Sequence, residues 1–336
     1  MNESPIQNTT STLEWSVIDV SYSPPSIVVM CNHVRYVVHV PDAAFAALPA
    51  LRALFNISPD ILEQFEEDAR ARSDFYSWAL EPLLPILRKD DEGIPRSYGR
   101  SITLGDVLYS PIVEYSLCVE SGKMVVHPKE QGPETHFMFG ASLTTALCNA
   151  WPRYLPLNIR LDARDDTLSS VPHHVLLPDG TRAFFQLLRR GDDTLLHNTL
   201  LAHHRIRAAA PLCVQVPRLL GLVHDARAVL GMLFADVGYG AVSLTRAVGA
   251  GAPARVRRRW SAQMMRTVHG LHQNRLVWGD ARPGNVVIDE GQNAWLAGLG
   301  GVSSPTWVPP EQAGTMDGDL VALKRIVDFT EGGFAI

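Results

Sequence analysis

The fold of this chain is decided by residues 276–302, which read LVWGDARPGNVVIDEGQNAWLAGLGGV. An aspartate (Asp280), a cation two residues on (Arg282), a proline and an asparagine (Asn285) follow one another in the spacing D-x-[KR]-P-x-N. Two short apolar runs then flank Gly291, and this pattern predicts a hairpin of two short strands. The segment therefore predicts a polar loop that leads into a β-hairpin.

This spacing is that of the catalytic loop of protein kinases and related small-molecule phosphotransferases. There the carboxylate accepts the proton of the attacking hydroxyl, the cation neutralises the moving phosphoryl group, and the Asn oxygen binds Mg²⁺. Asp280, Arg282 and Asn285 are therefore the candidate catalytic residues. Kinases deliver their main Mg²⁺ ligand just after the hairpin, in the sequence Asp-Phe-Gly. Here that place reads Gly-Leu-Gly, so Gly298 replaces the metal-binding aspartate.

Further motifs extend the likeness beyond the loop. WGD is followed by P-x-N, an A-W-L strand, a Gly-Gly pair, a W-V pair and T-x-x-G-D-L, which ends at Leu320. In this order the chain resembles the kinase-like proteins abundant in filamentous fungi, a kinase/aminoglycoside-phosphotransferase-like group. The resemblance covers residues 153–336, about half the chain. It implies an α+β, two-lobed protein-kinase-like fold, with the small lobe at about 153–236 and a truncated large lobe at about 237–336.

Residues 1–152 are expected to form a separate N-terminal α+β domain, to which no motif assigns a role. Alternating apolar residues predict strands over 13–20, 26–30, 34–40, 102–108, 112–119 and 123–126. Helical periodicity predicts helices over about 45–54, 60–72 and 75–87, although Pro82 and Pro85 count against the second half of the last one. The histidines of this half, which lack ligand spacing and predict no metal site, are His33, His39, His127 and His136.

The small lobe should begin with strands over 155–161, 173–177 and 182–188, the last two joined by a Pro-Asp-Gly turn. In kinases the loop between the first two strands is glycine-rich, so that backbone N–H groups close on the phosphates. Here the loop at 162–170 has no glycine and carries three carboxylates, Asp162, Asp165 and Asp166. Such a loop would repel a triphosphate.

Two further kinase groups are replaced together. The third strand should end in the lysine that grips the α- and β-phosphates, and the aligned residue is the neutral Gln186. The next helix, at about 194–208, should supply a glutamate partner, yet its first half reads TLLHNTLLAHH and contains no acid. Loss of both partners avoids a buried unpaired charge.

The large lobe is expected to follow strands at 216–223 and 229–235 and a hinge at 235–237. Its helices are expected at 243–248, 254–272 and 315–329. The resemblance implies that Asp319, at the start of the last helix, hydrogen-bonds the backbone of the catalytic loop, and the compatible alternative is an N-cap-like carboxylate. The arginines of the second helix form either a solvated face or an anion-binding patch, and they are Arg255, Arg257, Arg258 and Arg259.

Composition describes an ordinary soluble protein. The 336 residues include 46% hydrophobic and 19% charged residues, and the net charge of −5 gives no reason to expect a nucleic-acid partner. Four cysteines without a C-x-x-C pair indicate neither a zinc cluster nor a disulfide framework. No signal peptide and no membrane-spanning run is evident, so a cytoplasmic location is expected.

The replacements predict a degenerate, pseudokinase-type protein with no cofactor and no bound metal rather than a conventional kinase. Three functions stay open. The cleft between the lobes is reused for small-molecule binding or non-phosphoryl-transfer chemistry with Asp280 as acid or base, or the protein is a catalytically silent scaffold or regulatory binding protein. The third is an atypical active kinase that uses Asp280 and Asn285. The partner is thus a small molecule or a protein. Apolar surface on a truncated large lobe should be covered by residues 1–152 or by a second copy in a homodimer.

Overall fold

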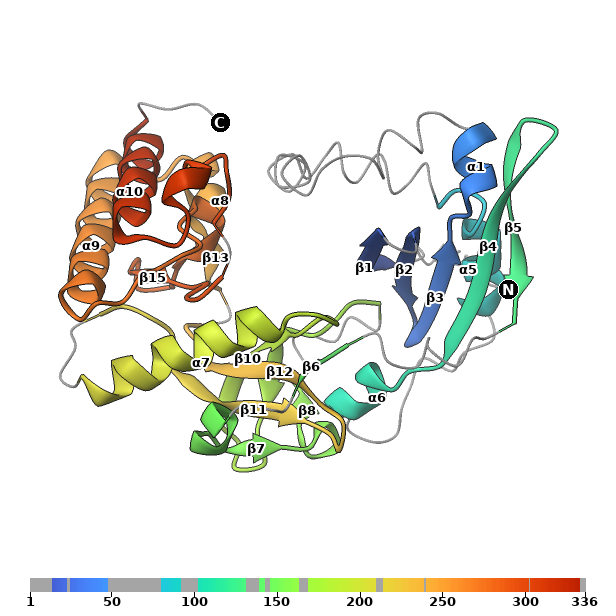
Figure 1. The fold of residues 1–336 in the computed structure, drawn as a ribbon, viewed down its shortest axis with the longest axis horizontal. Helices are drawn as coiled ribbons and strands as arrows, with labels where there is room; N and C mark the ends of the chain where they lie inside the picture. Colours follow the sequence, from blue (N-terminus) through green and yellow to red (C-terminus); the bar gives the residue numbers. More distant parts are fainter. Residues whose placement is uncertain are drawn as a thin grey trace, which may run out of the picture.

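The computed structural model describes residues 14–22, 25–47, 80–91, 102–130, 139–142, 146–162, 169–209, 214–238, 240–301 and 303–332. Within these ranges the chain is α+β, as expected, and has three separate sheets. Figure 1 shows the first sheet beside the second, and a mainly helical body on the far side of the second sheet. None of the described helices has the length and apolar character needed to cross a bilayer.

The first sheet has five strands in chain order, with β3 and β4 parallel and the other neighbours antiparallel. They are β1 (Ser16–Tyr22), β2 (Pro25–Cys31), β3 (Val34–His39), β4 (Ile112–Glu120) and β5 (Lys123–Lys129). Two helices, α1 (Asp42–Ala47) and α5 (Leu84–Asp91), accompany this sheet. Leu83 and Leu87 pack against Tyr36 of β3 in one buried cluster, so apolar strand residues and an amphipathic helix form a local core.

One prediction for this half is wrong. Residues 104–108 form a helix, α6 (Leu104–Leu108), where a strand was expected, because Thr103 and Asp106 make a reciprocal capping box that starts a helix. The helix expected at 75–87 is found in part, because α5 begins at Leu84 after a turn at residues 80–83. Pro85 lies in the first turn of α5, where a missing N–H breaks no helical bond. The helix predicted at 60–72 lies outside the described residues.

The second sheet has the order β7-β11-β12-β10-β9-β8, and β6 pairs with β12. Its strands are β6 (Ala141–Ser142), β7 (Arg153–Tyr154), β8 (Arg160–Leu161), β9 (His174–Leu176), β10 (Arg182–Leu187), β11 (Leu219–His224) and β12 (Ala228–Ala235). The strand predicted over 155–161 is wrong in its first part, because Pro156 starts a 3-10 turn, η2 (Pro156–Asn158), before β8.

Both faces of the second sheet are covered over part of their area. Helix α7 (Asp193–Ala208) packs Leu196 and Leu200 against Met232 on one face. On the other face, Leu104 and Phe139 from the first half of the chain share a core with Phe185. The first half therefore packs against the second, as predicted, and the described contacts of this core lie on the second sheet.

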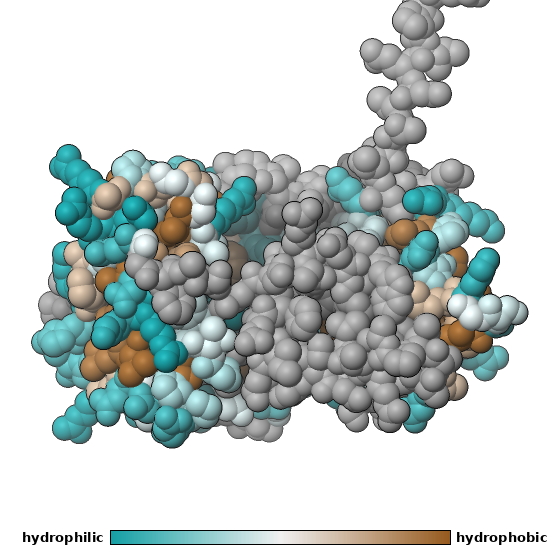
Figure 2. Space-filling model, turned by 90° about the horizontal axis from the view of Figure 1, so that it is seen from above, coloured by the Kyte–Doolittle hydropathy of each residue, from teal (hydrophilic) through white to brown (hydrophobic). Residues whose placement is uncertain are grey.

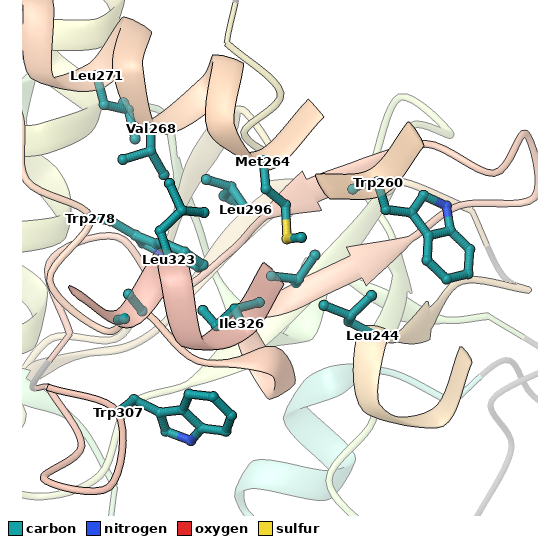
Figure 3. Close-up of a cluster of buried hydrophobic side chains, with 14 of the residues drawn as sticks. Leu244, Trp260, Met264, Val268, Leu271, Trp278, Leu296, Trp307, Leu323 and Ile326 are labelled. Atoms are coloured by element: carbon teal, nitrogen blue, oxygen red, sulfur yellow. The ribbon is translucent and has the colours of Figure 1, made fainter. Parts of the chain in front are cut away.

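The helical body contains α8 (Leu244–Gly249), α9 (Ala254–Gln273), α10 (Met316–Glu331) and a three-stranded sheet of β13 (Val242–Ser243), β14 (Val286–Ile288) and β15 (Ala294–Leu296). Three tryptophans that are almost fully buried, Trp260, Trp278 and Trp307, anchor its core (Figure 3). Among its described residues only Met265 and Leu320 are exposed large hydrophobic side chains. The described residues on the face of the molecule that Figure 2 shows are a mixture of hydrophilic and hydrophobic ones. The expected apolar surface is thus small.

Candidate functional site

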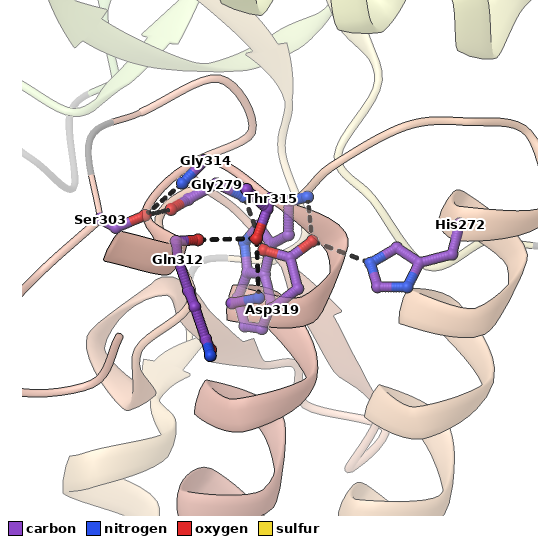
Figure 4. Close-up of polar contacts among 9 residues, drawn as sticks. His272, Gly279, Ser303, Gln312, Gly314, Thr315 and Asp319 are labelled. Atoms are coloured by element: carbon purple, nitrogen blue, oxygen red, sulfur yellow. Dashed lines mark hydrogen bonds and ion pairs between the residues drawn. The ribbon is translucent and has the colours of Figure 1, made fainter. Parts of the chain in front are cut away.

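The loop at 278–285 is fixed by a buried carboxylate from α10. Asp319, which is 2% exposed, accepts hydrogen bonds from the backbone N–H groups of Trp278 at 2.6 Å and Gly279 at 2.9 Å. His272 of α9 contacts the same carboxylate through Nε2 at 2.9 Å (Figure 4). The predicted bonding of Asp319 to the loop is confirmed, and it satisfies backbone donors that burial would otherwise leave unpaired.

A second set of hydrogen bonds, made by residues 303–315, holds the loop. The Ser303 hydroxyl donates to the Gly279 carbonyl and accepts from the Gly314 N–H at 3.3 Å (Figure 4). Thr315 then caps α10, accepting from the Gly318 N–H at 3.0 Å. Both the N–H and the C=O of Gly279 are therefore engaged, so the backbone before Asp280 has little freedom.

The three candidate catalytic residues lie together. Asp280 Oδ1 is 3.3 Å from Arg282 Nε, and their side chains are 14% and 28% exposed. Asn285, which ends η3 (Pro283–Asn285), donates its side-chain N–H to the Asp280 carbonyl at 2.9 Å. The backbone carbonyl of Asn285 accepts a hydrogen bond from the Ala297 N–H at 2.8 Å, which links the loop to the end of β15. All three side chains thus take part in local contacts that hold the loop.

Three glycines after β15 bring the next segment close to this loop. A Cβ on Gly298 would lie 2.6 Å from Asn285 Nδ2, and one on Gly301 would lie 2.9 Å from Asp280 Cβ. Gly298 also has a left-handed backbone, with φ of +74°, which favours glycine. The chain therefore passes here without room for an added side chain unless Asn285 moves.

The residues at this place do not fit Mg²⁺. That ion takes near-octahedral oxygen ligation, usually with at least one carboxylate. Gly298 offers no side chain, and the Asp280 carboxylate pairs with Arg282. Over the described part of the chain, no group of three or more His, Cys, Asp or Glu side chains is placed to hold a metal ion.

Helix α7 touches the same glycine segment. The Thr199 hydroxyl donates to the Leu299 carbonyl at 2.9 Å in a buried bond, and a Cβ on Gly300 would lie 2.6 Å from the Thr199 backbone N. Gln186, which the sequence resemblance aligns with the kinase lysine, is half-buried on β10 opposite Met232. Helix α7 and the helical body are therefore joined here by a hydrogen bond between neutral groups.

The hairpin beyond the loop is held by Asp289. Its carboxylate accepts from Trp295 Nε1 at 2.9 Å and from the Asn293 N–H at 2.7 Å. Burial raises the pKa of Asp289, but these hydrogen bonds outweigh burial, and the net pKa is lowered. Asp289 therefore has a structural role in the turn.

A group of aromatic rings that sequence reasoning missed lies on the second sheet. Phe184 of β10 stacks on His173, with ring centroids 5.3 Å apart, and meets the edge of His174 at 6.0 Å. His174 Nδ1 is in turn 3.5 Å from a carboxylate oxygen of Asp236, which follows β12. The available signal was the alternation of Arg182, Phe184 and Gln186, which puts these side chains on one face of a strand.

One histidine of α7 is strongly perturbed. His203 is buried, lies 5.5 Å from the Phe234 ring, and burial lowers its pKa to about 4. A neutral imidazole is thus part of the core between α7 and β12.

The arginines of α9 divide into two kinds. Arg257 donates to the Thr330 carbonyl at 3.2 Å, and Arg259, although exposed, donates to Asn293 Oδ1 at 2.6 Å. Arg255 and Arg258 are exposed. At least half of the run thus makes structural contacts.

The remaining residues singled out from the sequence are scattered. Asp162 is buried and lies 3.5 Å from Arg182 Nε, and Asp165 and Asp166 are outside the described residues. His39 pairs with Glu114 and His127 with Glu120, and His33 is buried. His136 is outside the described residues.

No protein-family model matches the sequence, and no curated protein matches it.

Proposed function

We propose that residues 153–336 form a kinase-like unit that has lost phosphoryl transfer, and that the protein acts by binding a small-molecule ligand. The order of elements supports the kinase likeness: a mainly antiparallel sheet with α7, then α8, α9, a polar loop, a hairpin and α10. Asp319 bonding to the loop backbone supports it further, because the sequence resemblance implied that contact.

The observation that carries the loss of chemistry is the contact between Gly298 and Asn285. An aspartate at 298 would supply the metal ligand, yet its Cβ would come within 2.6 Å of the Asn285 amide nitrogen. That amide is also bound to the Asp280 carbonyl, so it cannot move away without breaking a hydrogen bond. The side chain of Asn285 thus occupies the space that a side chain at position 298 would need.

The phosphate-binding side is equally changed. Gln186 is neutral, and the first half of α7 carries no glutamate that could pair with a lysine. Removal of one group that stabilises charge in a transition state commonly costs about 3 kcal/mol or more. Joint loss of the lysine, its partner and the metal ligand leaves little rate enhancement, even though such losses are not additive.

Binding is favoured over reaction by the state of Asp280. Its carboxylate is already paired with Arg282, is mostly buried, and lies close to the backbone of Gly301. A general base has to reach the proton that it removes at hydrogen-bond distance. The contacts of Asp280 point to a brace for the loop.

A second candidate is small-molecule chemistry other than phosphoryl transfer, with Asp280 as acid or base. The observation in its favour is the grouping of Asp280, Arg282 and Asn285 within one short loop, where a cation and an amide flank a carboxylate. Under this reading Asp280→Asn would abolish turnover of the bound ligand while the fold survives, a loss of about 10² to 10⁴ in rate.

Thermal melting with nucleotide tests the main proposal. A ligand at about 100 times its Kd stabilises the folded state by about 2.7 kcal/mol, and each kcal/mol is worth about 2–4 °C in a domain of this size. We expect no rise in Tm at millimolar ATP with Mg²⁺ relative to ATP with a chelator. A Mg²⁺-dependent rise of several degrees would contradict the proposal.

A further inference from the structure

An aromatic row lies on the face of the second sheet that α7 covers only in part. Leu196 and Leu200 of α7 cover Met232 on this face, whereas Phe184 is 37% exposed. Phe184 stands directly opposite His174 on β9 and Phe234 on β12. Directly paired residues of antiparallel strands project to the same face. The row His174–Phe184–Phe234 therefore crosses three strands, and α7 leaves Phe184 exposed within it.

The rings of this row are held in place. His173 stacks on Phe184 with an interplanar angle of 3°, and His174 meets it edge-on at 82°. At the other end, the buried His203 of α7 packs against Phe234. An aromatic side chain fixed by its neighbours loses little conformational entropy when a ligand stacks on it.

A carboxylate accompanies the row. Asp236 comes two residues after Phe234, and its side chain is 11% exposed. It accepts from the Gly238 N–H at 2.9 Å and contacts His174 at 3.5 Å, and no arginine or lysine of the described residues pairs with it. The nearby Arg182 is already paired with Asp162 at 3.5 Å. When His174 is neutral, Asp236 gives the row a negative charge next to an exposed ring.

We propose that the row His174–Phe184–Phe234 and Asp236 bind a small planar ring that carries a positive charge. The ring stacks on the exposed part of Phe184, and the charge lies near the Asp236 carboxylate, which combines a cation–π contact with ion pairing. An anionic ring is disfavoured by the same carboxylate. This inference rests on the proposed function, in that the protein binds its ligand without transferring a phosphoryl group.

Three probes with one ring system test the charge preference. Calorimetry at pH 8, where an ordinary imidazole is neutral, compares 1-methylnicotinamide (cation), nicotinamide (neutral) and nicotinate (anion). We expect the cation to bind about 10-fold more tightly than the neutral ring, and the anion to bind most weakly. Equal affinities for the three probes, or no binding of the cation at millimolar concentration, would overturn the inference.

Variants locate the site. Phe184→Leu keeps an apolar side chain without the π face, and Asp236→Asn removes the charge, so each should weaken binding of the cation about 10-fold. Leu157→Ala is the matched control, because Leu157 is 63% exposed on η2 of the same body. Unchanged affinity in folded Phe184→Leu, with a melting curve like that of the wild type, would place binding elsewhere and overturn the inference.

The two proposals fail in different ways. Mg²⁺-dependent binding of ATP would contradict the proposed function whatever the cation does. Failure of 1-methylnicotinamide to bind, together with no ATP effect, would overturn only the aromatic site.

Discussion

The loop at 278–285 and the aromatic face of the second sheet differ in how their polar groups are used. In the loop, Asp280 pairs with Arg282, Asn285 bonds to the loop backbone, and Asp319 takes two N–H groups. On the sheet, Phe184 is exposed and Asp236 has no arginine or lysine partner among the described residues. The residues with the strongest motif are therefore those most occupied by structural bonds, whereas the exposed ring and the carboxylate of the proposed ligand site belong to no motif.

The largest effect is expected at Asp319. Asp319→Ala leaves two loop N–H groups and His272 without their acceptor inside the core, so we expect the free energy of unfolding to fall by about 3–5 kcal/mol. Urea unfolding followed by tryptophan fluorescence measures it. Asp317→Ala, an exposed acid in the same helical turn, is the control and should change stability by less than about 0.5 kcal/mol. Equal small losses would show that the loop is not held by this carboxylate.

The glycine segment should be the next most sensitive. Gly300→Ala places an alanine in the left-handed backbone region, which lowers the unfolding free energy by about 1–2 kcal/mol. The added Cβ would also lie within 2.6 Å of the Thr199 backbone, which costs a further ~1–3 kcal/mol. Gly251→Ala isolates the first term, because Gly251 has a similar φ of +77° and open space around its Cβ. Chemical denaturation of both variants measures the difference between their losses of unfolding free energy, which is the cost of the close contact with Thr199. Equal losses would mean that α7 does not pack closely on this segment.

The pH dependence of His203 tests the buried end of the aromatic row. Its folded-state pKa of about 4 lies below the ordinary 6.5, so its contribution is complete above pH 6.5 and is lost as the pH falls from 6.5 toward 4. Between pH 7 and pH 5 this amounts to about 2 kcal/mol of unfolding free energy. His203→Leu should remove that part of the pH dependence, and His204→Leu, an exposed neighbour, should retain it. Identical pH profiles for wild type and His203→Leu would exclude a buried neutral imidazole.

Sequence reasoning placed most of the described strands and helices of both halves, including the strands of the first sheet. Strong periodicity and the Pro-Asp-Gly turn predicted β9, β10, α7, α9 and α10 within a few residues, and the motif predicted the Asp319 bond. At Leu104–Leu108 an apolar pattern that fits a strand is overridden by the Thr103 capping box, a choice that depends on two hydrogen bonds.

The aromatic row could not be predicted in the same way. It depends on the register that sets Phe184 opposite His174 and Phe234, and strand pairing between distant segments is not encoded in local periodicity. Likewise, Asp280 and Arg282 are two residues apart in sequence, but only the fold shows that a Cβ at Gly301 would lie 3.2 Å from Asp280 Oδ2.

The smallest stability effect is expected for Asp280→Asn. The amide keeps the size of the side chain but weakens the pair with Arg282, so unfolding free energy should fall by about 1 kcal/mol. A double-mutant cycle with Arg282→Gln should assign most of that loss to the pair. A loss of zero with no coupling would mean that Asp280 does not brace the loop and would strengthen the catalytic reading.

Single-turnover phosphoryl transfer from radiolabelled ATP tests most directly the claim that this loop holds structure without chemistry. Excess wild-type protein and Asp280→Asn are each incubated with ATP and Mg²⁺, and release or transfer of the γ-phosphate is followed against buffer. We predict that both proteins stay at the buffer rate and do not differ from each other. Conversion by the wild type above buffer, lost by about 10²-fold or more in Asp280→Asn, would contradict the account.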